Sequence, residues 1–169
     1  KDTDGNRALQ LIILTACRTT EVLNAQRSEI DIVKRIWQIP PDRIKTRKEH
    51  LVPLTEAMLE IINVQMARYQ SDLLFPGTRF KKPLSTGTCL KLMHDLGYIN
   101  HTGSKGHYVP HGFRATFSSW AFENGAHHFD VIETCLGHNV GNDVHRAYQR
   151  STLLDRRLAL LNNWCAMVT

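Results

Sequence analysis

Residues 110–125 read PHGFRATFSSWAFENG, and their pattern predicts a helix. Proline suits the first turn of a helix, where its missing N–H is not needed, so Pro110 can open the segment. Gly125 can end it, because glycine commonly follows the last helical residue. At 100° per residue the large apolar side chains between these ends fall on one arc, which predicts a core-facing helix over 111–124. These apolar side chains are Phe113, Phe117, Trp120 and Ala121.

Two basic side chains lie together at the start of this expected helix. His111 and Arg114 are three positions apart, so they share one flank of the helix. The first turn of a helix also presents unpaired backbone N–H groups, and together these features favour an anion. Taken singly, His111 could instead be a capping residue and Arg114 a surface charge.

The residues that follow add a second histidine and a tyrosine. A short apolar helix starting near Asp130 is ended by Gly137, and His138 comes next. A further helix, capped by residues 142–143, carries Tyr148 on an apolar stripe, where a tyrosine is usually a core residue. An arginine, two histidines and a tyrosine are nevertheless the groups that can cleave a phosphodiester without metal. A second arginine and a general acid are missing from this set.

An arginine near the N-terminus can complete the pair. An apolar helix is expected over 7–17, and a short helix begins at Thr19, whose hydroxyl can cap it. Arg18 lies at the junction between the two. A charged side chain is seldom buried unpaired, so Arg18 needs either a salt bridge, for which Glu21 is the candidate, or an anionic ligand.

Residues 30–54 change character and predict a small antiparallel sheet. β-Forming residues occupy 36–39, a second strand begins at Ile44 after two prolines, and 50–54 form a third. The turn before the third strand is basic. Such a cluster is usually a solvated turn, but it could also lie against DNA phosphates and insert one lysine into an active site. Its basic residues are Arg43, Lys45, Arg47 and Lys48.

Helices account for most of the remaining chain. Thr55 can cap a helix to about Tyr69, and Ser85 can cap another that runs to Leu96. Thr152 begins a last helix, which could pack on its own domain or on a neighbouring molecule. We therefore expect a mainly α-helical fold with a small antiparallel β-sheet.

Composition and charge narrow the class of protein. The chain has 169 residues, enough for one domain with a sizeable core, and is 42% hydrophobic and 22% charged, which excludes a disordered chain. Its net charge of +5 and pI of about 9.2 hint at a polyanionic partner. No apolar run is long enough for a membrane span, and the first residue is lysine, so we expect a fragment of a longer protein.

The sequence offers no metal or nucleotide site. Glycine-rich phosphate loops are absent, no histidine pair has the spacing of a zinc-binding helix, and no carboxylate cluster suggests magnesium. We therefore expect chemistry without a cofactor. No two cysteines form a Cys-x-x-Cys pair, which predicts reduced core thiols in a cytosolic protein. These are Cys17, Cys89, Cys135 and Cys165.

In order and spacing, these motifs resemble the catalytic domain of tyrosine recombinases, most closely the integrases of prophages and genomic islands. The likeness covers nearly the whole chain. It includes WQIP at 37–40, LVPL at 51–54, LFP at 74–76, HGFRAT at 111–116, DVIE at 130–133 and AYQR at 147–150.

The resemblance implies roles for six positions. By position, the two phosphate-binding arginines are Arg18 and Arg114, and the nucleophile is Tyr148. The remaining roles fall on Lys45 as the hairpin lysine, His111 as the first histidine and His138 as the second. Lys48 lies in the same turn as Lys45, but family spacing to the Val-Pro-Leu strand favours Lys45.

One motif departs from the family pattern. The family often has Thr-Gly-x-Arg where this chain has Thr15-Ala16-Cys17-Arg18. Losing the glycine changes local backbone freedom but is expected to leave Arg18 in place. Candidate contacts to DNA phosphates are Arg43, Arg47, Lys48, Lys82 and Lys105.

The resemblance also implies a fold, an activity and partners. It implies the catalytic-core fold of DNA breaking-rejoining enzymes and site-specific recombination through a 3′-phosphotyrosyl intermediate, without metal or ATP. Residues 1–169 would be the C-terminal catalytic domain, without the N-terminal DNA-binding domain. The partner would be double-stranded DNA attachment sites, bound by a homotetramer, although the free fragment could be monomeric. We expect it in the bacterial cytoplasm, at the nucleoid, with no membrane contact. The rival interpretations are a type IB topoisomerase and a DNA-binding module with a decayed active site.

Overall fold

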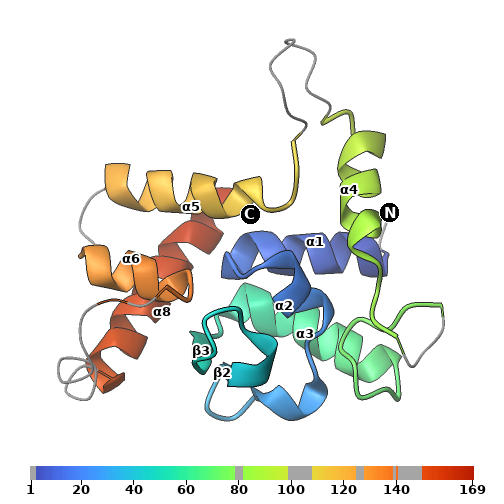
Figure 1. Cartoon of the computed structure of the whole chain (residues 1–169), viewed down its shortest axis with the longest axis horizontal. Helices are drawn as coiled ribbons and strands as arrows, with labels where there is room; N and C mark the ends of the chain where they lie inside the picture. The colour runs from blue at the N-terminus through green and yellow to red at the C-terminus, as the bar shows by residue number, and fades with distance from the viewer. Residues whose placement is uncertain (1–2, 79–81, 99–107, 125–127, 139, 141–149) are drawn as a thin grey trace.

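Helix α1 (Asp4–Thr15) is the element around which the other helices pack. The computed structural model describes residues 3–78, 82–98, 108–124, 128–138, 140 and 150–169. Figure 1 shows α1 in the middle of the molecule, with the small sheet and α3 below it, α4 on one side, and α5, α6 and α8 on the other. Helix α1 contacts α2, α3, α4, α5 and α8.

Helix α1 begins earlier and ends earlier than its sequence predicts. The hydroxyl of Thr3 caps it by accepting the N–H of Asn6 at 3.2 Å, so the helix starts before Arg7. It ends at Thr15 because Ala16 takes a left-handed conformation, with φ at 51°. The short helix α2 (Thr19–Leu23) follows.

The three-stranded antiparallel sheet has the order β1-β2-β3, with β1 at Ile30–Asp31, β2 at Ile36–Ile39 and β3 at His50–Pro53. In register, Trp37 pairs with Val52 and Ile39 with His50. The prediction of a strand from Ile44 is wrong. Pro41–Arg43 form a 3₁₀ turn, η2, because two successive prolines supply no N–H groups to a sheet.

Two helices confirm their predicted caps. Thr55 caps α3 (Glu56–Arg68) by accepting the N–H of Met58 at 3.4 Å. Ser85 likewise caps α4 (Thr86–Asp95), and Gly97 ends that region with φ at 86°.

The C-terminal half supplies three more helices. Helix α5 (Gly112–Glu123) matches its prediction closely, whereas α6 (Phe129–Cys135) is capped at His128 and not at Asp130. The expected helix over residues 142–148, with Tyr148, lies outside the described residues. Helix α8 (Arg150–Val168) begins before Thr152.

Helix α8 packs on its own domain, which answers the question that the sequence left open. Trp164 is 1% exposed and its indole N–H donates to the carbonyl of Ile13 at 2.8 Å. Its ring lies edge-on to Phe117, with centroids 5.4 Å apart, and is 5.2 Å from Trp120. The end of the chain is therefore fixed to α1 and α5.

The described structure confirms a mainly helical fold with a small antiparallel sheet. All four cysteines are buried and unbridged, as predicted, and burial raises the pKa of the Cys17 thiol to about 12. Among the described helices, none is long and apolar enough to cross a lipid bilayer.

Candidate active site

Arg114 joins the ends of two helices in the interior. It lies in the first turn of α5 and is 6% exposed, so it is not the surface charge that was its alternative reading. One guanidinium nitrogen, Nη1, donates to the carbonyl of Ala16 at 2.6 Å, and Nη2 donates to the carbonyl of Leu136 at 2.7 Å. Carbonyls at helix ends have no partner within their helix, so Arg114 satisfies both ends at once.

Arg18 lies near this buried guanidinium. Burial, and then the positive charge of Arg18, lower the pKa of Arg114. Arginine stays protonated at neutral pH, so the two positive charges repel each other. An anion such as a phosphate would relieve that repulsion, and two guanidinium groups suit its oxygens.

Glu21 fixes Arg18 at the start of α2. Its carboxylate accepts the backbone N–H of Arg18 at 2.9 Å and pairs with Nη1 at 2.7 Å. The N-cap of α2 is therefore Arg18, held by Glu21, and the predicted cap at the hydroxyl of Thr19 is wrong. Arg18 can form the salt bridge to Glu21 and bind an anion at the same time. Within the described structure, the salt bridge uses Nη1 and leaves Nη2 for the anion.

The turn after α6 places His138 beside Arg114. Gly137 takes φ at 65°, and the N–H of His138 then donates to the carbonyl of Glu133 at 3.0 Å. The imidazole Nε2 lies 3.4 Å from Nη2 of Arg114. Nδ1 lies 2.7 Å from a carboxylate oxygen of Glu133, and a carboxylate only accepts, so Nδ1 carries a proton and Nε2 faces the arginine.

His50 is a site residue that the sequence reasoning missed. It begins β3, is 6% exposed, and its ring would lie 3.4–3.5 Å from a side-chain carbon added at Gly137. Burial, followed by the charges of Arg157, Arg114 and Arg18, lowers the pKa of His50 well below the ordinary value. Strand alternation gives a signal, since His50 shares the inward face of β3 with Val52.

His111 stands at the N-cap of α5 without capping it. Its side chain makes no cap hydrogen bond and is exposed, so the capping role that was its alternative reading is wrong. It lies one turn before Arg114, at the same end of the helix.

The loop between η2 and β3 carries the basic cluster. Ile44 is buried at 3% exposure and anchors the loop, while Lys45, Arg47 and Lys48 are exposed. The backbone beside Lys45 is therefore held by the core while its ammonium group reaches solvent.

The remaining predicted DNA contacts differ in their surroundings. Arg43 faces the protein, where it pairs with Glu29 and donates to the backbone of Glu21 at 2.6 Å. Its guanidinium therefore does not point into solvent, as a phosphate contact would. Lys82 is exposed before α4. Lys105 and Tyr148 lie outside the described residues. Over the described ranges, no three His, Cys, Asp or Glu side chains gather to hold a metal ion.

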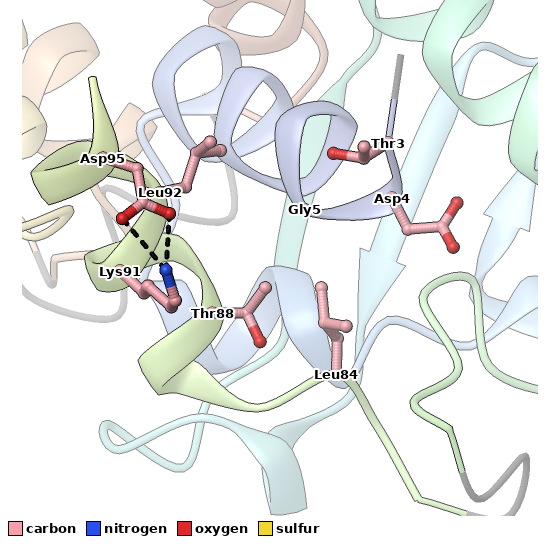
Figure 2. Close-up of a pocket in the computed structure, with 8 residues that line it drawn as sticks. All are labelled: Thr3, Asp4, Gly5, Leu84, Thr88, Lys91, Leu92 and Asp95. Carbon is pink, nitrogen blue, oxygen red and sulfur yellow. Dashed lines mark hydrogen bonds and ion pairs between the residues drawn. The ribbon is translucent and has the colours of Figure 1, made fainter. Parts of the chain in front are cut away.

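An open pocket lies elsewhere, between the start of α1 and α4 (Figure 2). Lys91 and Asp95 pair along α4, on one side of the pocket, at 2.6 Å. At a rise of about 1.5 Å per residue, the start of α1 lies roughly 15 Å or more from Ala16 at its other end. The pocket is therefore remote from the arginine pair. Its lining is Thr3, Asp4, Gly5, Leu84, Thr88, Lys91, Leu92 and Asp95.

Comparison with known proteins gives matches in sequence and in structure. The sequence profile described as the phage integrase family matches residues 3–153. The prophage integrase IntZ of Escherichia coli K12 is 32% identical over 158 residues, covering 93% of this chain. The chain spans 38% of the length of IntZ.

Solved structures share the fold. The integrase from mycobacterium phage Brujita superposes with a TM-score of 0.68 at 17% identity, covering 95% of this chain and 52% of that one. A lambda integrase tetramer bound to a Holliday junction gives a TM-score of 0.59 at 19% identity, covering 86% and 42% of the two chains.

Proposed function

The chain belongs to the phage integrase family of tyrosine recombinases, and from this premise we propose that it is a catalytic domain that cuts and rejoins DNA at specific sites. The observation that carries the proposal is that Arg114 lies 3.4 Å from the imidazole of His138 and binds the carbonyl of Ala16, two residues before Arg18. Two cationic forks and an imidazole fit the oxygens of one phosphodiester.

Each of these groups has a part in holding the phosphate. Arg18 and Arg114 bind its non-bridging oxygens and stabilise the charge that grows in the pentavalent transition state. With both ring nitrogens protonated, His138 donates to the same phosphate through Nε2, the nitrogen that faces Arg114, while Nδ1–H stays on Glu133. Glu21 and Glu133 hold the two side chains in these orientations.

Tyr148 is the proposed nucleophile. Its hydroxyl oxygen attacks the phosphorus and forms a 3′-phosphotyrosyl bond, while the bond from phosphorus to the 5′ oxygen breaks. A phenol with a pKa near 10 is a poor nucleophile at neutral pH, so its proton passes to His111 as the oxygen attacks.

The departing 5′ oxygen takes a proton from the ammonium group of Lys45. A 5′-hydroxyl from another strand can then attack the phosphotyrosine and return a proton to Lys45, while the oxygen of the departing Tyr148 takes back its proton from His111. The energy of the broken linkage is conserved in the covalent intermediate, so the exchange requires neither ATP nor a metal ion.

The proposed partner is double-stranded DNA that carries attachment sites. Arg47, Lys48 and Lys82 are exposed and can meet its phosphates, and Lys105 is a further candidate. The solved lambda integrase is a tetramer on a Holliday junction, and we extend that assembly to this chain as part of the proposal. Because this substrate is chromosomal DNA, the proposed reaction takes place at the nucleoid, in the bacterial cytoplasm.

The test is covalent capture of DNA on nicked suicide substrates in EDTA. A pool of nicked duplexes of randomised sequence is incubated with the protein, captured members are sequenced, and one is resynthesised. The wild type should form an adduct that survives denaturation, and Tyr148→Phe should not. Tyr98→Phe, at an exposed tyrosine beyond α4, is the matched control and should retain capture.

Two results would contradict the proposal. An adduct that requires Mg²⁺ would mean a metal-dependent reaction, and an adduct that persists in Tyr148→Phe would mean another nucleophile. Relaxation of supercoiled DNA without any strand exchange would favour the topoisomerase alternative.

A further inference from the structure

Arg43 is a basic residue of the β2–β3 connection whose side chain faces the protein. Its guanidinium pairs with both carboxylate oxygens of Glu29. The two side chains are only 13% and 7% exposed. A buried charge pair of this kind is a poor phosphate contact, because binding DNA would require breaking the pair.

Glu29 is itself firmly held. Its carboxylate also accepts the indole N–H of Trp37 at 3.0 Å and the backbone N–H of Gln26 at 3.1 Å. Trp37 is 1% exposed in the middle of β2. Glu29 is therefore a rigid acceptor, fixed from the core of the sheet, and it fixes Arg43 in turn.

The second terminal nitrogen of the Arg43 guanidinium contacts α2, the helix whose N-cap is Arg18. Nη2 of Arg43 donates to the backbone carbonyl of Glu21 at 2.6 Å. The side chain of Glu21 is the group that pairs with Arg18 at 2.7 Å. One residue, Glu21, thus receives Arg43 on its backbone and Arg18 on its carboxylate.

Lys45 follows Arg43 by two positions. Two residues span at most about 7 Å, and Ile44 between them is buried, so the backbone at Lys45 cannot move far from the clamp. The contacts of Arg43 therefore connect the lysine-bearing loop to the helix that presents Arg18.

We propose that Arg43 is a positioning residue that clamps η2 to α2 and so holds Lys45 at the departing 5′ oxygen. The inference rests on the proposed function, since it takes Lys45 as the general acid. It departs from the expectation that Arg43 contacts DNA. Loss of a DNA contact would weaken DNA binding, whereas loss of a positioning residue would impair protonation of the leaving group.

A sulfur substitution in the DNA separates these two effects. If sulfur replaces the bridging 5′ oxygen, the leaving group is a thiolate, whose conjugate acid has a pKa of roughly 8.5, as for cysteine, so it departs without a proton. A defect confined to Lys45 and its placement should then disappear, whereas a defect in phosphate binding or in Tyr148 should remain.

The experiment measures single-turnover cleavage of the captured suicide duplex in its oxygen and sulfur forms. With oxygen, Arg43→Met should be slowed about tenfold or more, toward the rate of Lys45→Ala. With sulfur, both variants should come within about twofold of the wild type. The double variant should be no slower than Lys45→Ala on the oxygen substrate, because both changes act on one step.

DNA affinity is the second measurement. Arg43→Met should bind the duplex as the wild type does, with the same slope of log affinity against log salt. Lys34→Met, which removes an exposed charge from the β1–β2 turn, is the control for a simple loss of positive charge and should cleave both substrates normally.

A second variant guards against misfolding. Arg43→Lys retains the charge opposite Glu29 but lacks the fork that also reaches Glu21, so it should show the same oxygen-specific defect. If both variants are slow on the sulfur substrate, or if the salt slope falls by about one, the positioning role is wrong. If Lys45→Ala is itself not rescued by sulfur, it is the proposed role of Lys45 that fails.

Discussion

Ala16 meets two requirements at the end of α1. It adopts φ at 51°, and its carbonyl accepts a hydrogen bond from guanidinium Nη1 of Arg114 at 2.6 Å. A side-chain carbon makes the left-handed region unfavourable by roughly 1–2 kcal/mol, and glycine avoids that penalty. The glycine of the family pattern is thus absent where the backbone would favour it most, yet Arg18 is still held by Glu21.

Replacing Ala16 by glycine should therefore stabilise the domain. Relief of the left-handed strain exceeds the added freedom of the unfolded chain, so the expected gain is about 0.5–1 kcal/mol. Urea unfolding measures it. Ala115→Gly, at an exposed position inside α5, is the control and should lose about 1 kcal/mol. A loss at both positions would mean that the backbone of Ala16 is not strained.

Glu133 should control the imidazole of His138. Removing the carboxylate in Glu133→Ala takes away the acceptor that orients the ring and favours its doubly protonated form, which should slow cleavage about tenfold. Glu133→Gln keeps an oxygen acceptor and should be less impaired. Nitrogen NMR of the His138 ring gives its protonation state directly, with Glu123→Gln, at the end of α5, as control. An unchanged ring spectrum in Glu133→Ala would contradict this role.

His50 should make stability sensitive to acid. Its pKa is lowered in the folded state, so the unfolded chain takes up the proton first, and stability falls once the pH drops below about 6.5. This group should remove up to about 1.4 kcal/mol between pH 7.5 and 5.5. Urea unfolding of the wild type and of His50→Leu at both pH values tests this prediction. Between the two pH values, the variant should lose up to about 1.4 kcal/mol less stability than the wild type. Equal losses would mean that His50 is charged in the folded protein.

At this scale the sequence predicts residue types better than side-chain directions. Arg18 and Arg114 stand out because arginines beside apolar runs need anionic or polar partners. His50 gives a weak signal because it lies at the end of a strand, and the sequence does not distinguish Arg43 from its exposed neighbours. Whether a basic side chain turns inward depends on a distant acceptor, here Glu29, which spacing alone does not reveal.

Among the elements, α8 is the one whose packing matters most for the site. Its Arg157 is buried and donates to the carbonyl of Leu51 in β3, and its Trp164 lies against α1 and α5. The helix therefore connects the sheet to α1 and to α5, the helix that carries Arg114.

Truncating Trp164 should destabilise the domain by about 3–5 kcal/mol, because Trp164→Ala removes a buried ring and leaves the carbonyl of Ile13 without its donor. Urea unfolding gives the value. Met167→Ala, at a half-exposed position on the same helix, should change stability by less than about 1 kcal/mol. A small effect for Trp164→Ala would show that α8 leaves this domain in solution.

The elements themselves follow from local signals where caps are present. Thr55, Ser85 and Gly97 bound their helices as hydroxyl caps and glycine stops should. The strand expected at Ile44 fails because a single buried apolar residue has the same pattern in a strand and in an anchored loop. Helix α1 extends further back than expected because Thr3 supplies a cap outside the apolar run.

For the whole molecule, the site depends on contacts between parts that are distant in the chain. Arg114 bonds Ala16, 98 positions away, and Leu136, 22 positions away, and so brings the ends of α1 and α6 to one point. Periodicity and capping cannot predict which helix ends meet. Resemblance to a family can predict it, because members that share the order of motifs also share the arrangement of the helices.

The central claim is that this arrangement serves Tyr148 as the nucleophile, and mapping the covalent bond tests it most directly. The adduct from the nicked duplex is digested with trypsin and nuclease, and the modified peptide is sequenced by mass spectrometry. We predict a nucleotide joined through its 3′ phosphate to Tyr148, in the peptide Ala147-Tyr148-Gln149-Arg150. A nucleotide on another residue, or one joined through a 5′ phosphate, would contradict the account.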